Sequence, residues 1–282
     1  MTQPVRIEHD LLGDRAVPAD VYYGIHTLRA LENFPITGTP ISIYPDLVVA
    51  LACVKQAAAI ANAELGLLDE ERSVAIRLAC EEVREGKLHG EFVVDVIQGG
   101  AGTSSNMNAN EVICNRALEK LRAAKGDYAR LHPLDHVNLS QSTNDVYPTA
   151  IKLALQLGIR RLLEEMNFLQ RCFAAKAAEF KDVLKVGRTQ LQDAVPMTLG
   201  QEFSTYAVMV SEDESRLAEA AELIREINLG ATAIGTGINA HPEYAALATR
   251  RLSEVSGIAF VVSPNLIEAT QDAGAFVQLS GV

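Results

Sequence analysis

A chain of 282 residues is long enough to bury a sizeable core, and its composition is that of a globular protein, because 48% of the residues are hydrophobic and 22% are charged. Its 36 acidic and 25 basic side chains give a formal net charge of −11, which argues against nucleic acid as a partner, since a phosphate backbone requires a concentrated basic surface. An anionic ligand would have to be held locally by hydroxyls, amides and helix N-termini, against an unfavourable overall field.

The start of the chain, MTQPVRIEHDLLGDR, contains no apolar run typical of a signal peptide, and no stretch approaches the roughly 18 apolar residues of a membrane span. The four cysteines are spaced too widely for a zinc site or a redox pair, so we expect small buried residues in a reducing compartment. These features predict a cytoplasmic protein that binds neither membrane nor nucleic acid.

The first half of the chain is expected to contain loops and fairly short helices. Residues 1–45 are rich in glycine and proline, which is typical of extended segments and loops. Apolar residues then recur at spacings of three and four, which predicts amphipathic helices that pack against one another. We expect these helices over residues 47–65, 69–86 and about 111–125.

Two longer helices are expected in the second half of the chain. Leu155, Leu162 and Leu169 are spaced by seven residues within the first, and a similar apolar pattern covers residues 198–228 in the second. The second helix should begin at Thr198, because a glutamine three residues later completes a capping box. Such seams predict coiled-coil-like bundle packing, within a subunit or between subunits.

The predicted fold class is therefore all-α, a long-helix bundle with a smaller mixed N-terminal domain. The segments at 92–97 (FVVDVI) and 260–262 (FVV) could be strands, but strands and helices do not alternate along the chain. The loop over 127–147 separates short helices from long ones. We therefore predict an N-terminal domain over residues 1–141 and a central helical-bundle domain over 142–282.

Three loops interrupt the helical pattern, and all three are dense in small hydroxyl and amide side chains. They cover residues 99–108 (GGAGTSSNMN), 139–145 (LSQSTND) and 186–193 (VGRTQLQD). Each is expected to run directly into a helix, where the positive end of the helix dipole favours a carboxylate. Ordinary helix capping is the alternative explanation for each loop taken alone. Three such loops in one chain favour a shared anion pocket.

Other kinds of site have less support in the residues. The histidines show no metal-ligand spacing on a helix, so we expect no metal site. The glycines at 99–102 are not followed by the Lys-Ser/Thr of a nucleotide-binding loop, and those at 235–237 lack a strand–turn–helix frame. The residues alone therefore predict a helical-bundle protein with an anion site made of loops.

Several segments resemble the aspartases, the aspartate ammonia-lyases of the aspartase/fumarase superfamily. The resemblance covers essentially all 282 residues and includes the three polar loops. Its further segments are RIEHDLLG (6–13), VPADVYYGIHTLRA (17–30), ENF (32–34) and NLGATAIGTGIN (228–239). YYGIHT (22–27) and IEATQD (267–272) resemble aspartases rather than fumarases, in which we would expect Trp-Gly-Ala-Gln-Thr and an Ala-Ala-His-Asp stretch.

The resemblance implies an enzyme that reversibly eliminates ammonia from L-aspartate to give fumarate, without a cofactor. It places Thr103, Ser142 and Thr143 around the β-carboxylate, where preorganised donors can stabilise the double negative charge that forms when the C3 proton leaves.

The same resemblance places Asn144, Thr189 and Gln190 around the departing α-amino group. Many superfamily members have histidine in place of Gln190, and an amide can bind an amine but cannot transfer a proton near neutral pH. Lys185 is a plausible cation for the local field, and an ordinary surface lysine is the alternative.

The family's catalytic serine lies on a mobile Gly-Ser-Ser-x-Met-Pro-x-Lys-x-Asn loop, and this chain reaches Val282 before any such segment. The segment at 104–107 (SSNM) resembles that loop only superficially. We therefore expect no catalytic base within these residues, a serine base beyond Val282, and an incomplete enzyme that is inactive by itself.

The resemblance also implies a homotetramer whose subunits pool their long helices, with each site drawing loops from three chains. Two alternatives remain open: a fumarate hydratase of the same superfamily, and a non-catalytic helical oligomerisation module.

Overall fold

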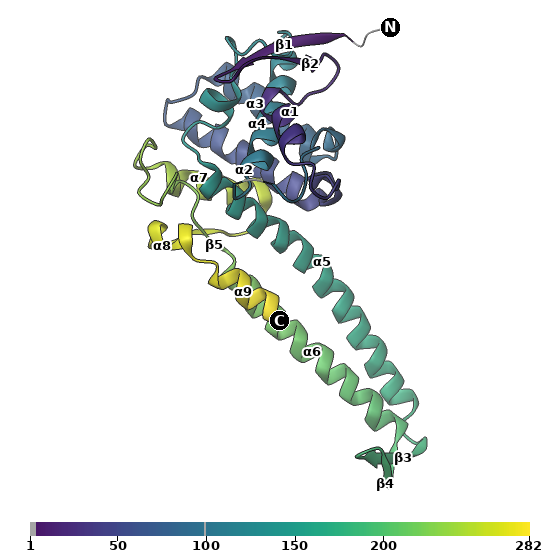
Figure 1. Cartoon of the computed structure of the whole chain (residues 1–282). Helices are drawn as coiled ribbons and strands as arrows, with labels where there is room; N and C mark the ends of the chain where they lie inside the picture. Colours follow the sequence, from purple (N-terminus) through teal and green to yellow (C-terminus); the bar gives the residue numbers. More distant parts are fainter. Residues whose placement is uncertain (1–3, 99) are drawn as a thin grey trace. The chain divides into compact units, whose positions relative to one another are not determined.

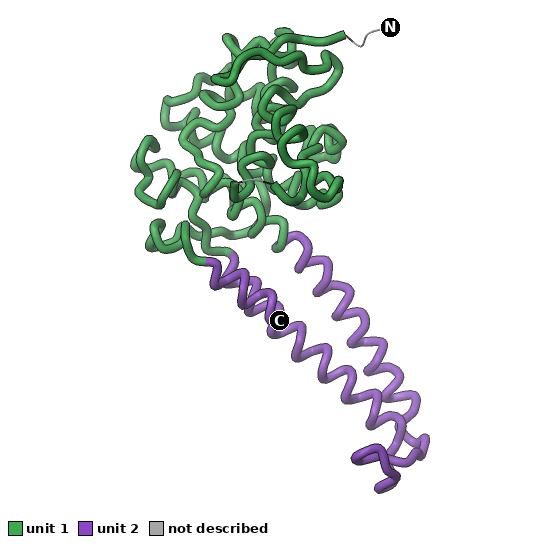
Figure 2. Tube along the Cα trace, viewed as in Figure 1, with its two compact units in different colours: residues 1–155, 225–272 green, residues 156–224, 273–282 purple. Residues whose placement is uncertain are grey.

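The computed structural model describes residues 4–98 and 100–282, and it divides the chain into two compact units (Figure 1, Figure 2). Unit 1 contains the residues up to Leu155 together with 225–272, and unit 2 contains 156–224 and 273–282. Unit 2 is therefore largely inserted in the sequence of unit 1. The domain boundary expected between residues 141 and 142 stays a prediction, because these units describe packing within one chain and not independently folding domains.

Unit 1 is mainly helical, with two small sheets. Its strands are β1 (Val5–Asp10), β2 (Gly13–Pro18), β5 (Glu226–Ile227) and β6 (Val261–Val262). Its α-helices are α1 (Ile25–Asn33), α2 (Pro45–Glu64), α3 (Glu70–Arg84), α4 (Thr103–Lys120), α7 (Tyr244–Ser256), α8 (Leu266–Gln271) and the first part of α5 (Thr143–Glu179). Short η helices cover Ile41–Ile43, His89–Glu91 and the π-helical turn Pro133–Val137.

Helix α2 is the centre of the core of unit 1. It contacts α3, α4 and α7, and it is buried on all sides because it is apolar on all sides. Among the described residues it is the one helix whose length and hydropathy would suit a membrane span, which the sequence analysis did not anticipate. Because 72% of that window is buried inside the protein, α2 has the environment of a core helix.

Unit 2 contains the long helical pair that the heptad spacing predicted. The remainder of α5 packs beside α6 (Leu199–Leu223), and Phe173 of α5 contacts the rings of Phe203 and Tyr206 of α6. The capping box at Thr198 is present, so the predicted start of this helix is confirmed. Helix α9 (Gly274–Gly281) contacts α6. The expected burial of the cysteines is wrong for one of them, since Cys172 of α5 is exposed.

The mainly helical fold class is confirmed, but some local predictions are wrong. Residues 92–97 form only one isolated bridge, between Pro40 and Asp95, whereas Val261–Val262 is a strand that pairs in parallel with β5. The third polar loop forms an antiparallel hairpin of β3 (Leu184–Thr189) and β4 (Gln192–Thr198). It therefore runs into a strand and not directly into a helix, because the residues after 191 pair with β3.

Candidate functional site

The first two polar loops meet in unit 1, where α4 and α5 begin. Gly102, the N-cap residue of α4, has a φ of 89°, and a Cβ atom there would lie 2.1 Å from the ring of Tyr147. Only glycine therefore allows Tyr147, near the start of α5, to approach the backbone so closely. The side-chain amide of Asn106 in α4 donates to Oγ1 of Thr143 across 3.1 Å. Two helix N-termini and their hydroxyl side chains are thus brought together, as the sequence predicted.

Ser142 caps α5, and its hydroxyl proton remains available to donate a hydrogen bond to a ligand. Its Oγ accepts from the N–H of Asn144 at 3.2 Å, and its own N–H donates to Oδ1 of Asp145 at 2.9 Å. The capping interpretation is therefore correct for this residue. A hydroxyl group that accepts one hydrogen bond can still donate its proton, so capping does not exclude ligand binding.

Asp145 joins the second loop to the segment at 228–239. Its Oδ2 accepts from the N–H groups of Gly230 and Thr232, both at 3.0 Å. Burial raises the pKa of this carboxyl to about 6, although these N–H groups act in the opposite direction. The sequence analysis assigned Asp145 no role. Its position three residues after Ser142 is a capping-box spacing that could have identified it.

A proline provides a second connection to the same segment. Pro148 lies inside α5 and has no N–H, so the carbonyl oxygen of Asn144 lacks its usual helical donor. The side-chain amide of Asn228 donates to that oxygen at 3.0 Å. The side-chain amide of Asn144 donates in turn to the carbonyl oxygen of Ala233 at 2.7 Å. The Oδ1 of Asn144 therefore remains available as an acceptor.

Lys55 of α2 is a buried cation beneath the second loop, and the sequence analysis did not identify it. Its Nζ donates to Oδ1 of Asn138 at 2.8 Å and to Oε1 of Gln141 at 3.0 Å. Complete burial lowers the pKa of Lys55 to about 7, and the Asp145 carboxylate partly offsets that effect. A lysine in the middle of a mostly apolar helix was the available signal, because a buried charge requires partners.

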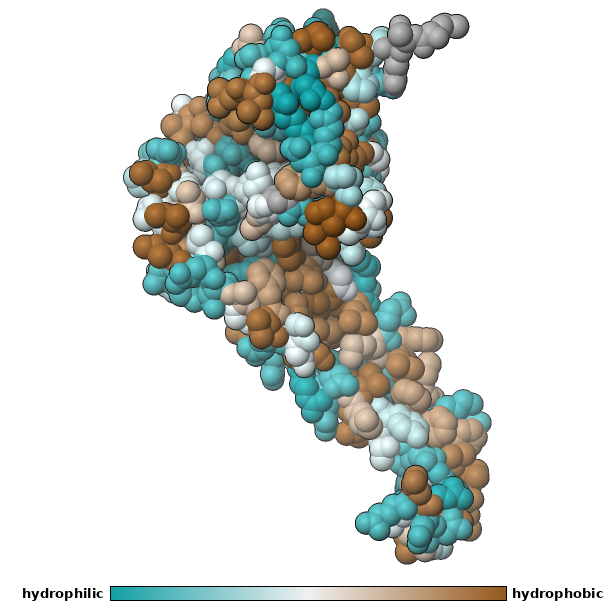
Figure 3. Space-filling view, in the orientation of Figure 1, coloured by the Kyte–Doolittle hydropathy of each residue, from teal (hydrophilic) through white to brown (hydrophobic). Residues whose placement is uncertain are grey.

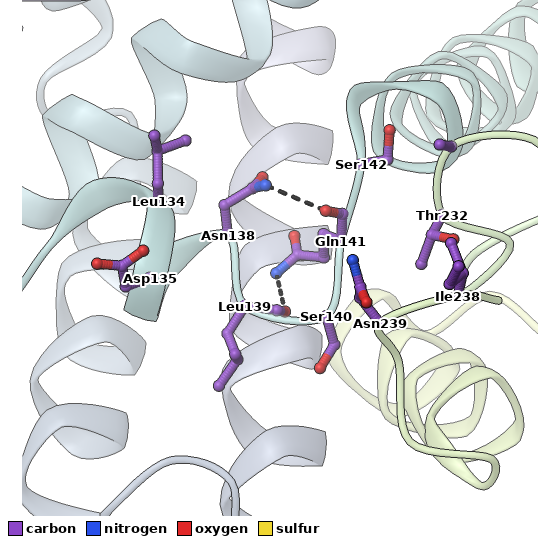
Figure 4. A pocket seen from close by; sticks show the side chains of 11 residues that line it. Leu134, Asp135, Asn138, Leu139, Ser140, Gln141, Ser142, Thr232, Ile238 and Asn239 are labelled. Atoms are coloured by element: carbon purple, nitrogen blue, oxygen red, sulfur yellow. Dashed lines mark hydrogen bonds between the residues drawn. The ribbon is translucent and has the colours of Figure 1, made fainter. Parts of the chain in front are cut away.

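A pocket of about 540 Å³ lies within unit 1 between the second loop and the 228–239 segment (Figure 4). It is lined by residues between Leu134 and Ser142 and between Thr232 and Asn239. Ser142 is the one predicted site residue that lines it. Thr143 and Asn144 follow Ser142 at the start of α5.

Thr103 is exposed at the first position of α4, three residues before Asn106. Its side chain therefore lies on the same side of the helix as that of Asn106. Gly99, the first residue of the first polar loop, lies outside the described residues.

The three remaining predicted site residues belong to the hairpin of unit 2. Thr189 ends β3, and Gln190 and Leu191 form the turn with φ values of 48° and 63°. Thr189, Gln190 and Leu191 are exposed, and Lys185 is half-buried. Lys185 is paired with Glu202, its Nζ lying 2.6 Å from Oε1. The roles expected for Thr189, Gln190 and Lys185 stay predictions. Within residues 4–98 and 100–282, no three His, Cys, Asp or Glu side chains are grouped so that they could hold a metal ion.

Comparison with known proteins agrees with this architecture. Residues 13–282 match the model of a family described as Lyase. The chain is 61% identical over 278 residues to an aspartate ammonia-lyase of Pseudomonas fluorescens, which covers 98% of this chain and 58% of that protein. The chain spans about three fifths of the length of the curated relatives that it matches.

Two solved structures share the fold. Fumarate lyase:delta crystallin from Brucella melitensis bound to cobalt has a TM-score of 0.97 at 55% identity, covering 99% of this chain and 60% of that chain. The class II fumarase from Schistosoma mansoni has a TM-score of 0.94 at 34% identity, and the match covers 99% of this chain and 61% of that chain. Together with the family match over residues 13–282, these similarities show that the chain belongs to the lyase family of the aspartase/fumarase superfamily.

Proposed function

We propose that the protein carrying this chain is an aspartate ammonia-lyase, which reversibly converts L-aspartate to fumarate and ammonia. The observation that carries the proposal is the state of two adjacent hydroxyls at the start of α5. Ser142 accepts from a main-chain N–H and Thr143 accepts from the amide of Asn106, so both retain a proton to donate to a ligand oxygen. The curated relatives at 52–61% identity support aspartate as the substrate.

The proposed reaction requires strong stabilisation of negative charge. A base removes the proton from C3, the C–H electrons form the carbon–carbon double bond, and the C–N bond breaks as ammonia leaves. The β-carboxylate carries the developing charge, and fixed hydroxyl donors such as Ser142, Thr143 and Thr103 bind it more strongly as that charge grows. The free Oδ1 of Asn144 is suited to accept from the substrate ammonium, with Thr189 and Gln190 as its proposed partners.

The proposed base is the serine of the family's mobile loop. Amide and unactivated hydroxyl side chains do not take up protons near neutral pH, so Gln190 and Thr189 are not suited to that role. The expectation that the 282 residues alone do not deaminate aspartate stays a prediction.

Absorbance of fumarate formed from L-aspartate tests the proposal directly. The protein at its natural length, the 282-residue chain and a Thr143→Val variant are compared, with L-malate as the alternative substrate. We expect fumarate from aspartate at natural length and a much lower rate for Thr143→Val. Faster formation of fumarate from malate would instead identify a fumarate hydratase, and no turnover of either substrate would favour a non-catalytic helical module. Turnover by the 282-residue chain at even about one per cent of the longer protein's rate would place the base within residues 1–282.

We also propose that the protein forms a cytoplasmic homotetramer through its long helices. Figure 3 shows apolar residues along these helices on the face in view. Six large apolar side chains on the unit 2 parts of α5 and α6 are 45–59% exposed in the single chain, namely Leu162, Phe168, Leu169, Val208, Met209 and Leu223. Exposed apolar residues in this number are typical of a protein interface, and a second copy with the same seam would cover them.

A further inference from the structure

The side-chain amide of Asn138 is a hydrogen-bond hub whose orientation is fixed by the backbone. Its Nδ2 donates to the carbonyl oxygen of Gln141 at 3.2 Å, so its Oδ1 must face the other way. That Oδ1 accepts from three donors: Nζ of Lys55 at 2.8 Å and the side-chain amides of Asn106 and Asn110, each at 3.2 Å. An ammonium group can only donate, so Lys55 requires an acceptor at this position.

The hub in turn fixes the orientation of the Asn106 amide. Nδ2 of Asn106 carries two protons, and it donates to Oδ1 of Asn138 and to Oγ1 of Thr143 at 3.2 and 3.1 Å. Its Oδ1 is buried and has no hydrogen-bond partner in the described part of the chain. Turning the amide over would place that Oδ1 against Oδ1 of Asn138, and two acceptors would then face each other without a proton between them. The direction of donation therefore runs from Asn106 to Thr143.

We propose that Asn106 is a positioning residue, which directs the Thr143 hydroxyl proton toward the substrate carboxylate by donating a hydrogen bond to Thr143 Oγ1. Asn138 and Lys55 fix the orientation of the Asn106 amide. We call this chain of hydrogen bonds from Lys55 through Asn138 and Asn106 to Thr143 the amide relay. This inference rests on the proposed function, because it requires an anion at Thr143. It extends the site from the hydroxyls at the loop surface to a buried amide and cation that do not themselves contact substrate.

A substitution that keeps the shape of Asn106 but reverses the direction of its hydrogen bond with Thr143 tests the inference. Asn106→Asp replaces the donating amide by a carboxylate, which can only accept, so the Thr143 hydroxyl should donate to Asp and turn away from the ligand. Asn110→Asp is the matched comparison, since Asn110 donates to the same Oδ1 of Asn138 at the same 3.2 Å. Thr143→Val is combined with each change in a double-mutant cycle, and kcat/KM for aspartate is measured in the protein at its natural length.

We expect Thr143→Val alone to lower kcat/KM by roughly 10²-fold, the scale for losing one donor to a developing anion. In the Asn106→Asp background, Thr143→Val should lower kcat/KM by less than about threefold, because the Thr143 hydroxyl already points away from the substrate. In the Asn110→Asp background it should again cost roughly 10²-fold. A merely structural role of Asn106 would lower the starting activity but leave the effect of Thr143→Val unchanged.

The outcomes separate the inference from the proposed function. An active parent that loses roughly 10²-fold at Thr143 in every background, Asn106→Asp included, would overturn the inference and leave the function standing. A parent that does not turn over aspartate would overturn the proposed function itself. If Asn106→Asp does not fold, as judged by circular dichroism, the cycle is run with Asn106→Ala. Additive effects of Asn106→Ala and Thr143→Val would then also overturn the inference, and coupling of at least about fivefold would support it.

Discussion

Replacement of Asp145 by asparagine should change the free energy of unfolding by an amount that depends on pH. The carboxyl has a pKa of about 6 in the folded protein and 3.8 in its unfolded reference state. Because the folded pKa is the higher one, the folded state holds the proton more tightly, and ionisation disfavours folding. Below pH 3.8 both states are protonated and there is no effect, and the penalty then grows through the interval between the two pKa values. Well above pH 6 it is constant at about 3 kcal/mol.

Between about pH 5 and about pH 6.5 the penalty rises from about 2 to about 3 kcal/mol. Asparagine does not ionise, so the variant lacks this penalty but loses hydrogen bonds, because only one of its two terminal atoms can accept. An N–H group of Ser142, Gly230 or Thr232 is then left unpaired, at a cost of about 1–3 kcal/mol. This loss of hydrogen bonds is the same at both pH values, so the stability of the variant relative to the parent should improve as the pH rises from 5 to 6.5.

Urea unfolding followed by circular dichroism at these two pH values measures the difference. We expect the stability of Asp145→Asn relative to the parent to improve by about 1 kcal/mol from pH 5 to pH 6.5. The range ends below the pKa of about 7 that burial gives Lys55, so that cation remains mostly charged. Asp127→Asn, which removes an exposed carboxylate of unit 1, is the control and should show the same difference at both pH values. A difference for Asp145→Asn that does not change with pH would refute the raised pKa.

Four substitutions address the site and the long helices. Thr143→Val should lower kcat/KM for aspartate by roughly 10²-fold, and activity within about threefold of the parent would contradict the role of Thr143. Thr149→Val removes a buried hydroxyl that has no partner in the described residues, so it should leave the free energy of unfolding unchanged or raise it by about 1 kcal/mol. Lys55→Met should raise the pKa of Asp145, because the lysine charge lowers it; an unchanged pKa of Asp145 in an NMR titration would show that the lysine charge does not act on this carboxyl. Leu162→Asp should dissociate the proposed tetramer in sedimentation experiments, because this side chain is 50% exposed in the single chain; an unchanged oligomer would exclude it from the interface.

Periodicity predicted the helices well where each helix carries its own signals. The capping box at Thr198 and the N-cap at Asp69 are local, since each side chain accepts from an N–H three residues later. The start of α2 was predicted within two residues although its N-cap, Tyr44, makes no side-chain hydrogen bond, and Pro45 at its first position is the local signal there. Neighbouring residues are sufficient to define these ends.

Helix α1 was missed because its signal lies elsewhere in the chain. Its N-cap is Gly24, without a side-chain cap, and the carboxylate of Glu111 in α4 accepts instead from the N–H groups of Gly24, His26 and Thr27. The capping group is therefore more than 80 residues away in sequence. The hairpin of β3 and β4 was missed for a related reason, since pairing across a turn at Gln190 decides it and small polar residues predict only a loop.

The polar loops of the site could be predicted from the sequence, but the residues packed behind these loops could not. Clustered hydroxyls in SSN and QSTND are visible in the sequence, and the structure brings the two segments together through Asn106 and Thr143. The hydrogen bonds among side-chain amides and the charges behind them were not predictable, because Lys55 and Asp145 are ordinary residues until tertiary packing buries them and brings Lys55 against the half-buried Asn138. Their importance comes from burial, which periodicity does not measure for single polar side chains.

The placement of the buried charges suits the anion site that we propose for this acidic chain. The Asp145 carboxylate accepts main-chain N–H groups on one side of the second loop, and the Lys55 ammonium donates to side-chain amides on the other. These opposite charges largely compensate one another, so the loop presents hydroxyl dipoles rather than a net charge. Neutral donors held in place bind a carboxylate less tightly than a paired cation would, and they gain strength as charge accumulates on it. A site of this kind favours the charged intermediate over the bound substrate and releases a dicarboxylate product readily, which is what a reversible elimination requires.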